Sequence, residues 1–352
     1  MFLLYKKVFS IRIKNMNQDF ITRRILSGII DQYISAIRED PHRSIRKLVD
    51  MAERTSNGPT QKICYQMMQE MGKNQCSPYY EMIHQLVLRT DPETVSRFGL
   101  NLGLNAWTLG ARDTRALIGE SGRRIPWAVL VDRRPAEERI AFESITEQVK
   151  KGLRCGMYSW MFFYGDRMDE WEQLSGLFRT FPENAFGLAV RSGGFRGIPL
   201  EAAAAHHNLM ILLDSDDGDR GENARRLADA RMLYSVYREI ANDAQAGEVT
   251  SGKWFGEITP ERPLFAFTLT ADNCPEAAAE RVRSYMWDTR LRQTYPLMPS
   301  DLITDFLIIS RLVTHKEVLY RVDPDGGLSE GKGLRFERCG LRIGDLFSAS
   351  NF

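Results

Sequence analysis

Polar side chains follow the short apolar runs in the second half of the chain, where they could bind a ligand or carry a proton. Each of them stands at or just after the end of a predicted buried strand: Asp132, Tyr164, Asp166, Arg191, Ser192, Asp214 and Asp272. In parallel β/α barrels, the loops at the carboxyl ends of the strands build the functional site. We therefore predict that these residues line one pocket for a small-molecule ligand.

The densest group of carboxylates is the run Asp214-Ser-Asp-Asp-Gly-Asp219. Paired carboxylates at a strand end can hold Mg²⁺ or Ca²⁺, and with Asp166 they would suit a metal-dependent lyase or hydrolase on a TIM-like barrel. The run does not match an EF-hand loop, because Gly218 falls one position early and the fifth position lacks Asp or Asn. Asp and Gly are also common in ordinary polar loops. We therefore favour a loop that caps a helix beginning near Asn223, and we predict no metal ligands.

From residue 99 onward, apolar runs alternate with amphipathic segments, which predicts β-α-β units around a parallel sheet. The predicted strands are Ile125–Asp132, Met157–Tyr164, Ala185–Arg191, Leu209–Asp214, Leu264–Thr270 and Val318–Val322. The predicted helices are Ala136–Leu153, Asp169–Phe181, Leu200–His206, Asn223–Ala244 and Pro275–Arg292. Leu100–Trp107 fits either a further strand or a helical connector. The fold class that follows is α/β, with a partial (β/α)6 TIM-like barrel.

The first part of the chain reads as helices. Ile25, Ile29, Ile30, Ile34 and Ile37 recur at helical spacing, and Asp40-Pro41 ends that run. We expect an N-terminal helical subdomain over 16–98, the barrel over 99–322, and a C-terminal extension over 323–352. We interpret residues 1–15 as a non-native or disordered extension, or a short strand, rather than as a secretory signal.

The composition is ordinary for a globular protein, with 43% hydrophobic and 26% charged residues and a net charge of +1. This balance favours neither nucleic acid nor an anionic membrane as a partner. The apolar runs are shorter than the roughly 20 residues of a membrane-spanning helix. The cysteines are odd in number and widely spaced, without a Cys-x-x-Cys pair: Cys64, Cys76, Cys155, Cys274 and Cys339. We therefore predict reduced thiols and a cytoplasmic protein.

Several segments resemble one branch of the radical S-adenosylmethionine (radical SAM) superfamily. That branch has an Ile-Pro-Trp strand before its cluster cysteines, a strand ending in Gly-Gly-Glu-Pro, and a strand ending in Thr-Asn-Gly. The similar pieces here are Ile125-Pro-Trp127, Met157–Phe163 with Tyr164-Gly-Asp-Arg167, Phe186–Val190 with Arg191-Ser-Gly-Gly194, and Tyr320-Arg-Val-Asp-Pro-Asp-Gly-Gly-Leu328. The resemblance implies a barrel of the radical SAM type, with S-adenosylmethionine and a [4Fe–4S] cluster as cofactors.

The residues that would hold this cluster are missing. No cysteine occurs between Cys76 and Cys155, so the three-cysteine loop after the first strand is absent, and Arg133, Arg134 and Arg139 stand there instead. A [4Fe–4S] cluster needs thiolate ligands. We therefore predict a pseudoenzyme without cofactors, acting as an accessory, scaffold or binding protein for a protein partner, such as an active radical SAM relative.

Two alternatives stay open at this point. One is an active radical SAM enzyme with atypical ligands, in which Cys76, Cys155 or Cys274 would have to converge. The other is the metal-dependent lyase or hydrolase, using Asp214, Asp216 and Asp166.

Overall fold

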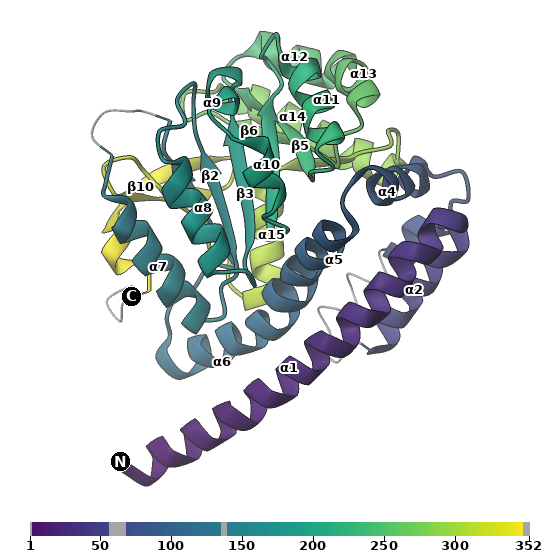
Figure 1. Ribbon diagram of the computed structural model, residues 1–352. Coiled ribbons are helices and arrows are strands. Elements are labelled where there is room, and N and C mark those ends of the chain that lie inside the picture. Colours follow the sequence, from purple (N-terminus) through teal and green to yellow (C-terminus); the bar gives the residue numbers. More distant parts are fainter. Residues whose placement is uncertain (1, 56–67, 135–138, 348–352) are drawn as a thin grey trace.

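A curled, mostly parallel β-sheet with alternating helices forms the body of the protein, and a layer of helices precedes it in the chain (Figure 1). The computed structural model describes residues 2–55, 68–134 and 139–347. The strands are β1 (Ala128–Asp132), β2 (Ser159–Phe163), β3 (Ala185–Val190), β4 (Leu209–Asp214), β5 (Tyr234–Ile240), β6 (Phe265–Thr270), β7 (Met298–Asp301), β8 (Tyr320–Val322), β9 (Gly327–Lys332) and β10 (Arg335–Arg342). This confirms the predicted α/β class and the partial TIM-like barrel.

The sheet is an open half-barrel. Its strand order is β10-β9-β8-β1-β2-β3-β4-β5-β6-β7, with parallel pairing from β8 to β7 and antiparallel pairing of β9 with β8 and β10. Strands β1 to β4 are buried at every position. Such continuous apolar runs are expected where helices cover both faces of a parallel sheet.

The outer face of the sheet is covered by the helices between the strands. These are α7 (Phe142–Arg154), α8 (Trp171–Thr180), α9 (Ser192–Arg196), α10 (Leu200–Ala204), α11 (Arg220–Asp229), α12 (Asp243–Thr250), α13 (Lys253–Ile258), the short 3-10 turn η2 (Thr259–Glu261) and α14 (Glu276–Arg292). Val129, Phe162 and Leu188 point into this outer core.

The inner face is filled by α15 (Leu302–Thr314), which connects β7 to β8. Leu302 and Phe306 of this helix pack with Leu130 and Leu212 of the strands in one buried cluster. The indole N–H of Trp127, just before β1, donates to the carbonyl of Phe306 at 2.8 Å. This helix therefore fills the concave side of the half-barrel together with Phe98 from one of the N-terminal helices.

The N-terminal helices lie below and to the right of the sheet in Figure 1. They are α1 (Phe2–Glu39), α2 (Pro41–Thr55), α4 (Pro78–Arg89), α5 (Pro92–Leu100), the π-helix η1 (Asn101–Gly110) and α6 (Ala111–Ser121). Ile34 and Ile37 of α1 pack on Val87 of α4, whereas Phe98 of α5 joins the inner core of the sheet. The segment 2–15, expected to be an extension or a short strand, forms the first part of α1. None of the described helices has the length and apolar character needed to cross a membrane.

One predicted element is wrong, one segment had been left open, and one strand was missed. The expected helix Asn223–Ala244 is instead α11, β5 and the start of α12. The polar residues Ser235, Tyr237 and Glu239 alternate with Val236 and Ile240 of the outer core, so β5 lacks the continuous apolar run of its neighbours. Leu100–Trp107, left open above, is helical and belongs to α5 and η1. The strand β7 was missed, since it has only 4 residues and contains Pro299. Its recognition needs the sheet context, because proline normally argues against a strand.

The predicted helix Ala136–Leu153 begins later than expected, at Phe142 as α7. Residues 135–138 lie outside the described residues. Residues 327–342, assigned to a C-terminal extension, form β9 and β10 and continue the sheet past residue 322. The division into domains stays a prediction. The remaining 3-10 turn, η3 (Ile343–Asp345), follows β10.

Candidate functional site

The candidate site is the carboxyl edge of the sheet on its inner face, which we call the mouth. Asp132 ends β1, Arg191 and Ser192 follow β3, and Asp214 ends β4. Asp166 follows β2 and Asp272 follows β6. All of the predicted site residues therefore reach the same edge, as their positions after strands require, but the side chain of Tyr164 faces the outer core.

Asp132 and Arg134 form the first ion pair of the mouth. Arg134 Nε and Nη2 donate to the two carboxylate oxygens of Asp132 at 3.0 and 2.8 Å, and its Nη1 donates to Glu239 of β5 at 2.6 Å. The backbone N–H of Arg134 also donates to Asp132, at 3.0 Å. Burial alone would raise the pKa of Asp132, but the hydrogen bonds and charge of Arg134 outweigh it and hold that pKa below its usual value.

Asp214 forms the second polar group of the mouth. Its Oδ2 accepts from Arg191 Nε at 3.1 Å and from the hydroxyl of Tyr237 at 3.3 Å, while its Oδ1 accepts from the backbone N–H of Asp216. Burial and the neighbouring Asp217 raise the pKa of Asp214, even though Arg191 opposes this shift. Burial together with the Asp214 charge raises the pKa of the Tyr237 hydroxyl well above its ordinary value.

The acidic run after β4 holds neighbouring loops together. Asp217 accepts from the backbone N–H of Ser192, Asp219 pairs with Arg196, and Asp216 pairs with Arg238 at 2.9 Å. The helix α11 does follow this run, but Asp219 at its N-cap makes no side-chain capping bond. The run is therefore a polar loop as predicted, although its carboxylates fasten the loop after β3 instead of capping a helix.

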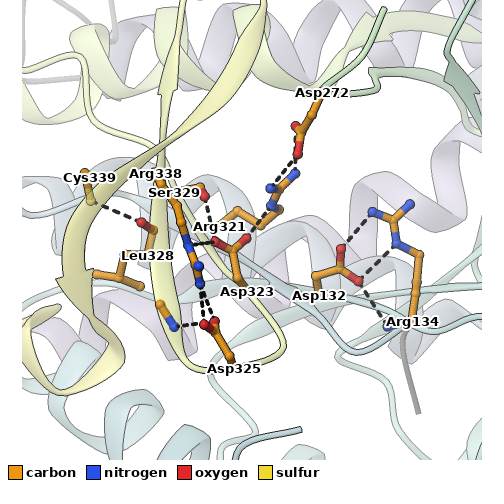
Figure 2. A network of polar contacts seen from close by, with 11 residues as sticks. Asp132, Arg134, Asp272, Arg321, Asp323, Asp325, Leu328, Ser329, Arg338 and Cys339 are labelled. Carbon is orange, nitrogen blue, oxygen red and sulfur yellow. Dashed lines mark hydrogen bonds and ion pairs between the residues drawn. The ribbon is translucent and has the colours of Figure 1, made fainter. Parts of the chain in front are cut away.

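A third polar group extends the mouth toward the antiparallel strands (Figure 2). Arg321 of β8 donates to both oxygens of Asp272, at 3.1 and 2.9 Å, and to Asp323 at 2.8 Å. The other oxygen of Asp323 accepts from Ser329 of β9 at 2.7 Å. Asp272 is thus tied to the edge of the sheet through an arginine that the sequence patterns did not single out.

Tyr164 does not join the mouth, because the residue after Phe163 points to the opposite face of the sheet. Its ring lies in the outer core, and its hydroxyl donates to Glu170 at 2.6 Å. The same Glu170 accepts from the guanidinium of Arg133, which is only 1% exposed. Burial and the nearby Glu170 raise the pKa of Tyr164. This residue is a structural anchor for the loop after β1.

The glycines after β3 are required by a close approach of two loops. A Cβ at Gly193 would lie 2.6 Å from the carbonyl oxygen of Asp166, and one at Gly194 would lie 2.4 Å from that of Gly165. The space beside Ser192-Gly193-Gly194 is thus filled by the loop after β2. A phosphate cradle at these glycines is inconsistent with that packing.

The thiols lie at different places in the fold. Cys155 caps the end of α7 and is buried before β2, at the amino edge of the sheet, whereas Cys274 lies after β6, at the carboxyl edge. Cys76 precedes α4 and is exposed, and Cys339 lies in β10. Cys64 lies outside the described residues. A [4Fe–4S] cluster needs several thiolates at one point, and the described cysteines do not fit that requirement.

The carboxylates offer no better fit to a metal. Among residues 2–55, 68–134 and 139–347, no group of three or more His, Cys, Asp or Glu side chains is placed to hold a metal ion. The oxygens of Asp214 and Asp217 already accept hydrogen bonds from arginine, tyrosine and backbone donors.

Sequence reasoning missed the partners that complete the mouth. Arg134, Tyr237, Glu239 and Arg321 are charged or polar side chains in or just after strands that contact the predicted site residues or one another. Arg134 was read only as part of the loop that lacks cysteines, and Tyr237 and Glu239 were hidden in a predicted helix. Correct alternation of β5 would have placed both side chains on the inner face with the last residue of β4.

Two surface grooves lie beside the sheet, and the second of them includes Gly218 and Asp219 of the acidic run after β4. One, of about 480 Å³, lies between α4 and the amino ends of β5 and β6, and the other, of about 600 Å³, lies between α11 and η2. Arg89, Tyr234 and Pro260 line both of them.

No family model matches the chain, and a search of curated proteins returned no match.

Proposed function

We propose that this chain is a pseudoenzyme on a radical SAM-type half-barrel, which acts by binding and as an accessory or scaffold to a protein partner. The observation that carries the proposal is the loop after β1. Arg133 and Arg134 stand there, and both guanidinium groups are engaged in ion pairs with carboxylates. A cluster-binding loop would place thiolates at this point of the sheet.

The active-enzyme alternative has less support. It requires Cys76, Cys155 or Cys274 to ligate one cluster, but Cys155 and Cys274 belong to opposite edges of the sheet. Bringing them together would need β2 or β6 to leave the sheet. Since both strands are almost fully buried, that rearrangement would cost much of the core.

The metal-enzyme alternative also has less support. Asp214 is held by Arg191 and Tyr237, and Asp216 by Arg238. A divalent ion would have to displace these donors before it could bind. Asp166 contacts the glycine loop through its backbone and does not supply a third ligand beside them.

Protein binding is supported by the helical layer, which carries exposed apolar side chains. Ile21 and Ile25 lie one turn apart on α1 and are 57% and 58% exposed. Large apolar side chains in such positions are common at contact surfaces.

The test is affinity capture from the organism that encodes the chain, with the wild-type protein and the Ile21→Ser/Ile25→Ser variant. We expect a partner that the wild type retains and the double variant loses. The matched control is Ile308→Ser, which removes an isoleucine that is 40% exposed on α15 and should leave capture unchanged. A protein that stays alone at native abundance and turns over a small molecule by itself would refute the proposal.

A further inference from the structure

Arg134 connects two strands that are not neighbours in the sheet. Asp132 belongs to β1 and Glu239 to β5, with β2, β3 and β4 between them. The curl of the sheet brings both carboxylates to one guanidinium, at 2.8–3.0 Å for Asp132 and 2.6 Å for Glu239. Figure 2 shows the Arg134 side chain turned back onto Asp132 at the end of β1.

An aromatic ring completes the environment of this guanidinium. Arg134 Cζ lies 5.8 Å from the centroid of the Phe163 ring, and that ring packs edge-on against Tyr237 at 5.8 Å. Aromatic faces attract cations within about 6 Å of the ring centroid. A planar cation at this point thus meets a bidentate carboxylate, a second carboxylate from across the mouth, and an aromatic face.

We propose that the mouth is a binding site for a guanidinium group of a ligand, and that Arg134 occupies this site as an internal substitute. The fork of two parallel N–H donors on one carboxylate is the arrangement that suits guanidinium better than an ammonium ion. This proposal rests on the proposed function, since it assigns a ligand class to a mouth that carries no cluster.

The site is built to persist when the Arg134 side chain withdraws. Arg134 lies beyond the end of β1, so its departure breaks no strand pairing. The backbone N–H of Arg134 still holds one oxygen of Asp132. The adjacent Arg133 is anchored independently, by Glu170 and by the carbonyl of Ile140 at 2.8 Å. The loop therefore stays attached at its base.

The test uses the full chain with Arg134→Ala, which vacates the site, and methylguanidine as the probe. We expect a saturable rise in the melting temperature of this variant with methylguanidine, because a ligand that binds only the folded state stabilises it. Methylurea, the neutral analogue of nearly the same shape, should give no shift. Methylammonium should bind more weakly, and potassium chloride at equal ionic strength controls for screening.

Two further variants make the result specific. Arg134→Ala/Glu239→Gln should lose the methylguanidine shift, because the second carboxylate is gone. The wild type should require more probe than Arg134→Ala to reach the same shift, since the tethered Arg134 guanidinium competes for the same carboxylates. If Arg134→Ala does not fold, Arg134→Gln with calorimetric titration replaces it.

Two outcomes would overturn the proposal: no saturable effect in a folded Arg134 variant, or an effect that methylurea reproduces or Glu239→Gln leaves intact. Iron analysis of the same protein decides separately whether the chain lacks a cluster. The guanidinium site and the pseudoenzyme proposal can therefore fail independently.

Discussion

At the scale of single residues, the arginines in the loops after β1 and β2 differ sharply in burial. The side chain of Arg133 is 2% exposed and paired with Glu170, whereas that of Arg167, in the next loop, is 69% exposed. A buried ion pair contributes little more stability than apolar residues of similar volume would. Removing one partner is nevertheless costly, because the other charge loses its buried counter-ion. Arg133 therefore matters for stability, while Arg167 is a matched control.

We predict that Arg133→Met lowers the free energy of unfolding by about 3 kcal/mol, because Glu170 loses its bidentate partner and keeps only Arg139, at 3.7 Å, and the Tyr164 hydroxyl. Arg167→Met should change it by no more than about 0.5 kcal/mol. Urea denaturation of the variants measures both values. Similar effects for the two substitutions would contradict the assigned role of Arg133.

A second prediction concerns the pH dependence of the Asp132–Arg134 pair. The pKa of Asp132 is lowered in the folded protein, so the pair contributes stability above the unfolded pKa of about 3.9 and loses it as the pH falls through the folded pKa. The stability difference between wild type and Arg134→Gln should be largest near neutral pH. Denaturation at several pH values should show it shrinking below about pH 4. A difference that stays constant over this range would mean that Asp132 does not depend on Arg134.

At the scale of elements, the sequence allowed prediction of those strands whose two faces are both apolar. β1 to β4 were placed close to their observed bounds for that reason. β5 was not, because Tyr237 and Glu239 belong to the mouth while Val236 and Ile240 belong to the outer core. Polar residues on one face of β5 thus removed the continuous apolar run that identified its neighbours.

The candidate site could also be predicted only in part from the sequence. The positions of Asp132, Arg191 and Asp214 follow from the rule that parallel strands end at one edge. The contact between Arg134, after β1, and Glu239 of β5 did not follow, because it depends on the curl of the sheet. Tyr164 was predicted to line the same pocket. Because successive residues of a strand point to opposite faces, its side chain instead lies in the outer core.

The contact between the loops after β2 and β3 gives a prediction at this scale. Gly194→Ala should destabilise the protein by about 1–3 kcal/mol, because its Cβ would overlap with the backbone of Gly165. The control is Gly176→Ala on α8, where a Cβ meets nothing within 4 Å. That change should stabilise the protein by about 0.5–1 kcal/mol through helix propensity. Thermal denaturation compares them, and a tolerated Gly194→Ala would show that the two loops can separate.

At the scale of the whole molecule, the open half-barrel is closed from inside by its own chain. α15 from the C-terminal half and α5 from the N-terminal helices pack on the inner face of the sheet. Sequence periodicity indicates that such helices are amphipathic, but it does not say which face of the sheet they cover. The packing of these helices on the concave side could therefore not be predicted from the sequence.

This arrangement makes α15 a principal source of stability. We predict that Phe306→Ala costs about 3–5 kcal/mol, since it opens a cavity beside Trp127. Ile308→Ala on the same helix removes a side chain that is 40% exposed and should stay within about 0.5 kcal/mol of wild type. Chemical denaturation of both variants tests whether the inner face is filled as described. Equal, small effects would indicate that α15 does not pack there.

The measurement that tests the central claim most directly is anaerobic purification and reconstitution with iron and sulfide, followed by metal analysis and visible spectroscopy. The loop after β1 carries paired arginines in place of thiolates. We therefore predict a colourless protein with iron far below one equivalent of cluster per chain. Near-stoichiometric iron and sulfide, with the broad visible absorption of a thiolate-ligated cluster, would contradict the pseudoenzyme account.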